Sequence, residues 1–587
     1  MADFKTALAF LVLSSLSLSA NAYVTTLHAP AVLQNQNVGS LTLFVLNVTP
    51  GNGVVQVSGP AIVDSDTLAS AKTAAAYASS YLGLNEKDYN FNYTIEDSGA
   101  NVSGPSGGLA FTLLAVAGLE HVQLAQNFTV TGTISLNGSV GLIGGITDKS
   151  QAAASGGMHF ILVPSAPNET LETLLYYISQ QENSIPVVEV SNVSQALPYA
   201  LGQKQPSMLS INLTQSFNTG ETGNSNVSCT SCNLSAFGQL VNSTFNFTRA
   251  TIASLPSNFS SAMQQLSGNI DNYRKLANDG FLYTSADFSF LSFISAFTLA
   301  NADNYTVSRA ANLLSNVSGY CASLVPPPLT TSNYEFVTGG ELRQYWANIT
   351  IASAEQQLSS EQTTDDIITS IYTAASAEGW CMASAQLYSI ASYMGGDYVQ
   401  VSPSLRASAA NAISKARNYG NSMYLQSALQ AYNKGDYATA LYAAAYANAF
   451  DSPIPNMSTA QLYSGTLANI NNATNGTWPS QFASQSEFYF RQSLLSKGDV
   501  ERSYASQAYL TSRLAAGLAS ANGAVTHSFI VSNQSTAGLS PQLSNIEQQI
   551  SQIYDLMFIN AALLFVVLVV ILVKILPQGK PKRRQQQ

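Results

Sequence analysis

Charged side chains are scarce in this sequence of 587 residues, where only 10% of positions are Asp, Glu, Lys or Arg. No basic patch precedes the extreme C-terminus, which argues against a nucleic-acid-binding protein. Hydrophobic residues make up 46% of the chain, and abundant Ser, Thr, Asn and Tyr compensate for the low charge. The composition therefore predicts globular structure with a neutral, hydroxyl-rich surface, and the length predicts two or three folded units.

Residues that bind metals are also few. The four His residues are dispersed, at positions 28, 121, 159 and 527, and a single Cys-x-x-Cys is a weak zinc signal without a second pair. The simplest interpretation of the four cysteines is two disulfides, one joining Cys229 to Cys232 and one joining Cys321 to Cys381. A redox-active or metal site is the weaker alternative. We therefore predict neither a metal nor a cofactor.

Both ends of the chain carry membrane-targeting patterns. Residues 1–22 are typical of a signal peptide, with Lys5, an apolar stretch and small residues before the cleavage point, although an uncleaved anchor is the alternative. Residues 556–576 are apolar over a length that predicts a transmembrane helix. The basic tail, 577–587, is then expected in the cytoplasm, with everything before the membrane segment outside.

Two further patterns bear on this topology. About twenty Asn-x-Ser/Thr sites are scattered from Asn47 to Asn533 and none follows the membrane segment, as expected of an exported glycoprotein. Residues 539–555 predict a juxtamembrane helix with an apolar seam. That seam either oligomerises the protein or packs on its own helical domain. Asn101 and Asn137 belong to sites within or beside the cleft proposed below, where a glycan would obstruct access.

The remaining chain divides by composition. Residues 24–204 alternate strand-like and helix-like patterns, with a hairpin expected between strands at 40–48 and 54–58, and they predict a compact α+β domain. Residues 205–255 are rich in Gly, Ser, Thr and Asn and are interpreted as a linker holding the near Cys pair. Residues 256–525 predict a helical domain. Its Tyr-Asn-Lys-Gly-Asp-Tyr turn at 432–437 resembles the turn between paired helices of tetratricopeptide-like repeats.

A possible catalytic pair stands out in the α+β domain. Ser106 lies in Gly-Pro-Ser-Gly-Gly before an apolar helix, and Lys149 opens a second helix after Gly144-Gly145. A serine hydroxyl needs a base to act as a nucleophile, and no His stands in a recognisable triad context. A lysine can serve if burial and the positive end of a helix dipole lower its pKa. The backbone around Ser106, Gly107 and Gly104 is expected to approach the substrate and hold an oxyanion.

These blocks, together with Thr131-Gly132-Thr133, Ala152-Ala153-Ala154-Ser155-Gly156-Gly157 and Ile161-Leu162-Val163-Pro164, resemble the proteolytic domain of Lon proteases in order and spacing. The resemblance covers residues 30–200. It implies Ser106 as nucleophile, Lys149 as general base and Thr131 as a hydrogen-bond partner of that lysine. It also implies a serine endopeptidase, and Lon-type domains commonly form hexameric rings, so a homo-oligomer is expected.

The sequence departs from the Lon pattern at several points. No Gly-x-x-x-x-Gly-Lys-Ser/Thr phosphate loop occurs, so ATP is not expected as a partner. Thr133 replaces the Glu of the family's Thr-Gly-Glu motif, and Ser103 replaces an acidic residue commonly found before Gly-Pro-Ser. The layout looks most like exported, membrane-anchored archaeal Lon-like proteases that lack the ATPase module.

The sequence thus predicts a membrane-anchored, extracytoplasmic, ATP-independent serine endopeptidase that cleaves unfolded or flexible polypeptides. Two alternatives stay open. In one, the Lon-like domain is an inactive scaffold in a cell-surface binding protein whose helical hairpins perform recognition. In the other, the glycan density and hydroxyl-rich composition belong to a structural envelope component.

Overall fold

The computed structural model describes residues 22–32, 39–59, 63–96, 104–166, 170–209, 223–229, 231–302, 305–360, 363–473 and 475–531. The chain divides into two compact units, Met1–Ile530 and Val531–Gln587, of which the first holds nearly all described residues. The signal peptide at 1–22 lies almost wholly outside the described ranges, and so do the juxtamembrane helix, the transmembrane helix and the basic tail. Within those ranges, no helix combines the length and hydrophobicity that a membrane crossing requires.

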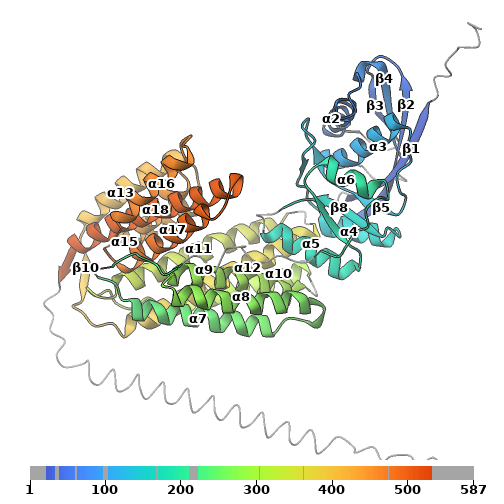
Figure 1. Ribbon diagram of the computed structural model, residues 1–587. Coiled ribbons are helices and arrows are strands. Elements are labelled where there is room, and N and C mark those ends of the chain that lie inside the picture. The colour runs from blue at the N-terminus through green and yellow to red at the C-terminus, as the bar shows by residue number, and fades with distance from the viewer. Residues whose placement is uncertain are drawn as a thin grey trace, which may run out of the picture. The chain divides into compact units, whose positions relative to one another are not determined.

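The first sheet of the α+β domain contains four strands, β1 (Tyr23–Val32), β2 (Gly39–Pro50), β3 (Val55–Ser58) and β4 (Tyr89–Glu96), in the order β1-β2-β4-β3 (Figure 1). β1 pairs antiparallel with β2, and β2 pairs antiparallel with β4. Alternate residues of β2 point into the core, as expected for a half-buried strand. Among the described strands, β1 pairs with β2 alone, so it forms one edge of this sheet.

The predicted hairpin between the second and third strands is wrong. β4 lies between them and pairs parallel with β3, so that Val57 is opposite Tyr93. The Pro-Gly-Asn-Gly turn instead wraps the start of β4, because Asn90 Oδ1 accepts hydrogen bonds from the backbone N–H groups of Asn52 and Val54. A turn signal identifies a reversal of the chain but does not specify which strand fills the adjacent position.

Two helices cover this sheet and form its core. α2 (Ser65–Tyr81) contributes a row of Ala residues, and α3 (Gly108–Glu120) is buried along nearly its whole length. Tyr93 of β4 stacks edge-on against Phe111 of α3 and donates a hydrogen bond to the Phe111 carbonyl oxygen. Burial of α3 on all sides fixes the position of the residues that immediately precede it.

A second, parallel sheet follows, with β5 (Phe128–Val130), β8 (Phe160–Pro164) and β9 (Val187–Val190) in the order β5-β8-β9. A short hairpin, β6 (Thr133–Ile134) with β7 (Val140–Gly141), separates β5 from α4 (Ile146–Ser155). α5 (Thr170–Asn183) and α6 (Val193–Ala200) complete the domain. Along β8, Phe160 and Leu162 face the core of the first sheet, whereas Ile161 and Val163 belong to the apolar cluster that includes the helical region.

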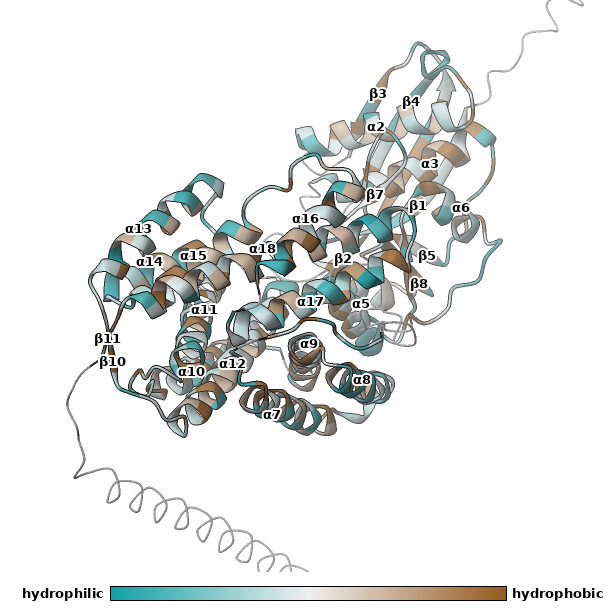
Figure 2. Ribbon diagram, turned by 60° about the vertical axis from the view of Figure 1, so that its left-hand side comes forward, coloured by the Kyte–Doolittle hydropathy of each residue, from teal (hydrophilic) through white to brown (hydrophobic). Residues whose placement is uncertain are grey.

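The helical region contains twelve described helices and a small two-stranded sheet. Their bounds are α7 (Leu234–Ala253), α8 (Ser260–Asn278), α9 (Leu282–Ala300), α10 (Val307–Ser323), α11 (Tyr334–Leu358), α12 (Thr364–Ser392), α13 (Ser404–Ala416), α14 (Met423–Lys434), α15 (Tyr437–Phe450), α16 (Thr459–Asn471), α17 (Thr477–Leu494), α18 (Gly498–His527), β10 (Val399–Val401) and β11 (Phe529–Val531). α7 and α8 carry both hydrophobic and hydrophilic residues (Figure 2), as expected of helices with one buried face.

The predicted linker at 205–255 is too long, because α7 starts at Leu234. Phe237, Leu240, Val241 and Phe245 recur at helical spacing and are buried in the shared apolar cluster. Asn233 caps this helix by accepting a hydrogen bond from the Ala236 N–H. The abundance of Ser, Thr and Asn on the exposed face obscured an amphipathic helix.

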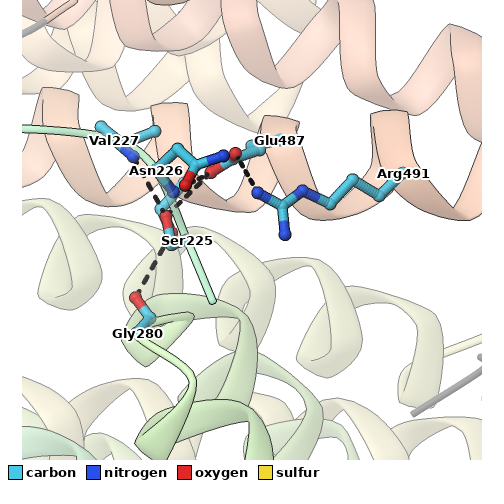
Figure 3. A network of polar contacts seen from close by, with 7 residues as sticks. Ser225, Asn226, Val227, Gly280, Glu487 and Arg491 are labelled. Atoms are coloured by element: carbon cyan, nitrogen blue, oxygen red, sulfur yellow. Dashed lines mark hydrogen bonds and ion pairs between the residues drawn. The ribbon is translucent and has the colours of Figure 1, made fainter. Parts of the chain in front are cut away.

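Part of the same segment is also docked rather than free. The Ser225 hydroxyl and the Asn226 N–H both donate hydrogen bonds to Glu487 Oε2 at 2.9 Å (Figure 3). The other oxygen of this carboxylate, Oε1, accepts from Arg491 at 2.5 Å, and both residues lie on α17. The Ser225 N–H donates to the Asp279 carbonyl oxygen at the end of α8. Residues 223–229 therefore bridge two helices, and the near Cys pair is held against the helical region.

The two disulfides join Cys229 to Cys232 and Cys321 to Cys381, which are the pairings that the sequence predicted. Their Cα–Cα distances are 5.8 Å and 5.4 Å, within the usual range. The far pair links α10 to α12 and both its cysteines are buried. It closes a sequence separation of 60 residues, against 3 for the near pair.

Loss of the far disulfide is expected to destabilise the protein more than loss of the near one. The chain-entropy estimate is about 4 kcal/mol for the replacement of Cys321 and Cys381 by Ala, against about 2 kcal/mol for Cys229 and Cys232, because the longer loop restricts the unfolded chain more. Urea unfolding of the two double variants, followed by circular dichroism, measures both. An equal or larger loss for the Cys229 and Cys232 variant contradicts this account.

Candidate active site

A cavity of about 460 Å³ contains both Ser106 and Lys149 in its lining. The α+β domain supplies further walls from residues 29–32 of β1, from Phe44 of β2, from Phe111 of α3 and from the start of α5. The opposite wall belongs to the start of α12 in the helical region, with Thr363, Asp365, Asp366 and Thr369. The sequence predicted Ser106 and Lys149 at a cleft but gave no indication of the walls from β1, β2, α5 and α12.

Ser106 is held by the turn that enters α3. Gly104 has a φ of 101°, and the 3-10 turn Pro105–Gly107 then leads directly into the helix. Asp64, which caps α2, accepts a hydrogen bond from the Gly104 N–H at 3.0 Å, and the Ser70 hydroxyl donates to the Pro105 carbonyl oxygen at 3.3 Å. Two residues of α2 and its cap therefore fix the backbone immediately before Ser106.

This arrangement changes the expected role of Gly104. Its N–H is bonded to Asp64 and cannot also bind a substrate oxyanion. Gly104 is instead the residue whose left-handed backbone lets the chain turn into α3. Gly107 lines the cavity at the first turn of a helix, where backbone N–H groups lack acceptors within the helix. Of the two glycines, Gly107 is the one whose position suits oxyanion binding.

Thr131 does not contact the lysine as the resemblance implied. Its hydroxyl donates to the Ser106 carbonyl oxygen at 3.4 Å, and the Gly132 N–H donates to the same oxygen at 2.9 Å. Thr131 is 1% exposed, so this contact is shielded from water. Thr131 and Gly132 therefore hold the backbone of Ser106 in place. They are bonded to the serine and not to the lysine.

Lys149 lies in the first turn of α4 and is 4% exposed. Burial lowers the pKa of its amine from 10.5 to about 8, and the nearby Asp365 and Asp148 carboxylates oppose this shift. Burial disfavours the charged form because the protein interior solvates an ammonium group poorly. A lysine of this kind has a substantial neutral fraction at mildly alkaline pH, which a general base requires.

The positive end of the α4 dipole contributes less than the sequence suggested. Gly145 occupies the N-cap position and offers no side-chain acceptor. Asp365 takes that role from the helical region, because its carboxylate accepts hydrogen bonds from the Ile146 and Thr147 N–H groups at 2.7 Å and 3.0 Å. A carboxylate at this end of the helix neutralises the field that was expected to act on Lys149.

The structure brings Ser106 and Lys149 to one cavity without a hydrogen bond between their side chains in the described residues. Catalytic hydrogen bonds are often longer in the resting enzyme and tighten when substrate binds. The described residues contain no group of three or more His, Cys, Asp or Glu side chains placed to hold a metal. The catalytic roles of Ser106, Lys149 and Gly107 stay predictions that this geometry permits.

Of the two residues that differ from the Lon pattern, Ser103 and Thr133, the structure describes only Thr133. Ser103 lies outside the described residues, as does Asn101. Thr133 is half-buried in β6, where it pairs with Gly141 of β7. Asn137, in the turn of this hairpin, is not part of the cavity lining, and its amide oxygen accepts hydrogen bonds from the Ser139 N–H and hydroxyl.

Comparison with known proteins identifies the domain that carries Ser106 and Lys149. Residues 32–202 match the family of the Lon protease (S16) C-terminal proteolytic domain. The chain is 30% identical to an archaeal Lon protease of Methanocaldococcus jannaschii over 145 residues, or 23% of this chain and 22% of that protein. It is 26% identical to a Lon protease of Neorickettsia sennetsu over 182 residues, covering 30% of this chain and 22% of the relative.

A third relative, an archaeal Lon protease of Halobacterium salinarum, is 28% identical over 118 residues, which are 20% of this chain and 16% of that protein. The chain spans about a fifth of the length of the curated relatives it matches. Residues 32–202 thus form a Lon-type proteolytic domain, which supports a serine-type peptidase. The helical region that follows lies beyond the family match.

Burial of Lys149 predicts a pH-dependent stability. The folded-state pKa, about 8, is below the 10.5 of the exposed side chain, so the unfolded chain binds more protons between these values. The wild-type protein should therefore gain up to about 3 kcal/mol in unfolding free energy relative to Lys149→Met as the pH rises from 8 to 10.5. Urea titrations of both proteins across that range measure the difference. A pH-independent difference means that the lysine is not buried as described.

Proposed function

We propose that the protein is a serine endopeptidase that cleaves unfolded or flexible polypeptides without ATP. The observation that carries this proposal is a buried lysine with a pKa lowered to about 8 that lines the same cavity as Ser106 within a Lon-type proteolytic domain. A serine and a neutral amine within one cavity are the two groups that acyl transfer without a histidine requires.

In the proposed reaction, the neutral Lys149 amine accepts the proton of the Ser106 hydroxyl while Oγ attacks the carbonyl carbon of the scissile peptide bond. The resulting oxyanion is stabilised by backbone N–H groups at the start of α3, with Gly107 as the candidate donor. Collapse of this intermediate breaks the C–N bond, and Lys149 returns the proton to the leaving amine. Water, deprotonated by the same amine, then hydrolyses the acyl-enzyme.

Polypeptides fit the surroundings of the two residues. Residues 29–32 belong to an edge strand and line the cavity, and an edge strand presents backbone groups that can pair with an extended chain. The sequence has no phosphate loop, so energy from ATP is not expected to unfold substrates. Segments that are already extended or flexible are therefore the proposed substrates.

An inactive scaffold is the second candidate, and two observations favour it. Ser106 and Lys149 are not hydrogen-bonded to each other in the described residues, and Thr131 contacts the serine backbone instead of the lysine. A binding protein could retain the domain for its shape alone. Substrate hydrolysis separates the two functions.

Replacement of Ser106 by Ala is expected to reduce hydrolysis of an unfolded casein by at least about 1000-fold, because the acyl-enzyme cannot form. Thermal stability should be unchanged, since Ser106 is partly exposed at the cavity wall. Ser155→Ala, at the exposed end of α4, is the matched control and should retain activity. Hydrolysis that persists in Ser106→Ala excludes this nucleophile, and a folded wild-type protein without activity supports the scaffold.

We also propose that the bulk of the protein is extracytoplasmic and is held by a helix at residues 556–576, with a signal peptide at 1–22 and a cytoplasmic tail. The two disulfides suit an oxidising compartment. Asn226, Asn316, Asn348 and Asn456 lie in glycosylation motifs and are exposed on the folded chain. The apolar run and the basic tail are the sequence features that support the orientation.

Expression in a host with N-glycosylation tests this topology. The full chain should stay in carbonate-washed membranes and lose mass on treatment with a glycosidase, whereas a chain that ends at residue 538 should appear in the medium. The expected separation follows from removal of the apolar run. Retention of the shortened chain in the membrane pellet, or the absence of any glycan, contradicts the proposed orientation.

A further inference from the structure

α4 and α12 start at the same place, and their first turns are capped differently. α12 has a complete capping box, in which Thr363 bonds the Asp366 N–H and the Asp366 carboxylate bonds the Thr363 N–H. Asp365 is therefore not needed by its own helix. α4 has only Gly145 at its N-cap, and the Asp365 carboxylate supplies the acceptor that this glycine lacks.

The contact is reciprocal. Asp148, in the first turn of α4, accepts a hydrogen bond from the Thr364 hydroxyl at 2.5 Å and a longer one from the Thr364 N–H at 3.4 Å. Each helix thus provides a carboxylate to the first turn of the other. We call this set, Asp148, Thr364 and Asp365 with the Ile146 and Thr147 N–H groups, the α4–α12 clamp. It joins positions more than 200 residues apart in the sequence.

The clamp is shielded from water. Asp148 is 1% exposed, Asp365 is 8% exposed, and Lys149 beside them is 4% exposed. Electrostatic interactions are stronger in such surroundings than at the surface. Lys149 is consequently subject to the charge of Asp365 from α12 and of Asp148 from its own helix, and Asp366 of α12 and Glu172 of α5 also line the cavity.

We propose that Asp365 is a positioning residue of the active site, through which the helical region caps the helix that carries Lys149 and sets the pH at which that lysine becomes neutral. This inference rests on the proposed function, because it assigns a regulator to the same general base. The α4 N–H groups and the lysine ammonium both attract the Asp365 carboxylate, so docking of the helical region determines both the orientation and the protonation of Lys149.

The direction of the effect follows from the charges. Asp365 and Asp148 favour the ammonium form, in opposition to burial, which lowers the pKa of Lys149 to about 8. Asp365→Asn keeps the size of the side chain, removes the charge and leaves one of the two α4 N–H groups without an acceptor. Neutral Lys149 then forms at lower pH, and the catalytic helix loses part of its cap.

The test measures kcat/KM for an unfolded polypeptide against pH. Wild-type activity should rise with a midpoint near pH 8, and in Asp365→Asn the midpoint should move down by about one pH unit. Asp499→Asn is the matched control, because it removes the same charge from the exposed first turn of another helix, α18, which does not line the cavity. Its midpoint should stay with the wild type. Equal midpoints in all three proteins overturn the proposal.

A second measurement needs neither a variant nor activity. Hydrogen exchange of wild-type amides should show slow exchange at Ile146 and Thr147, although the first N–H groups of a helix ordinarily lack partners. Fast exchange at both positions means that the clamp is absent and overturns the inference. If the amides are protected but no wild-type hydrolysis occurs, the clamp stands as structure while the peptidase function, and with it the regulatory role of Asp365, is lost.

Discussion

The ammonium group of Lys149 must lose most of its hydration when α4 packs into the fold, and that requirement constrains the elements around it. An isolated charge in a protein interior is costly, so a buried lysine is either neutralised by a lowered pKa or given counter-charges. This protein does both in part: burial lowers the pKa to about 8, whereas Asp365 and Asp148 retain some stability for the charged form. The serine, the turn that presents it and the cavity are arranged around this amine.

The proteolytic domain does not enclose the lysine by itself. Ile146 of α4, Ile161 of β8 and Leu174 of α5 belong to the same apolar cluster as Phe237 and Trp478 of the helical region. Two regions that share one apolar core cannot separate without exposing it, and interfaces of that kind resemble domain interiors rather than transient contacts. Apolar burial alone does not fix an orientation, so directional hydrogen bonds such as those of the α4–α12 clamp determine how α4 and α12 are oriented relative to each other.

Much of the local structure was predicted from the sequence, whereas most long-range contacts were not, with the Cys321–Cys381 disulfide as an exception. The apolar helix expected after Ser106 is α3, because its apolar run and the glycines before it are local signals. The hairpin prediction failed because β4, which follows α2 in the chain, lies between β2 and β3 in the sheet, and the linker prediction failed because polar composition concealed the apolar spacing of α7. The first error arises where tertiary contacts decide which strands pair, and the second where a local pattern was masked by polar residues.

The site shows the same division. Ser106 and Lys149 were identified from their glycine-rich contexts, and the fold places both at one cavity. The role expected for Thr131 came from resemblance, and its hydroxyl instead supports the Ser106 carbonyl. Asp365 could not be found, because Thr-Thr-Asp-Asp is a typical helix start and nothing in the sequence indicates that its first acid caps a different helix.

The pKa of Lys149 lies in a range where a distant charge such as that of Asp365 has a large effect on protonation. With a pKa of about 8, about one-tenth of Lys149 amines are neutral at pH 7. In this range the neutral fraction changes almost in proportion to the equilibrium constant, so a change of one pKa unit alters it severalfold. A lysine with an unperturbed pKa would stay almost wholly charged at pH 7 after the same change, and one with a pKa far below neutrality would stay almost wholly neutral. The Asp365 carboxylate, which the helical region contributes, therefore acts where the protonation of the proposed base is most sensitive to its surroundings.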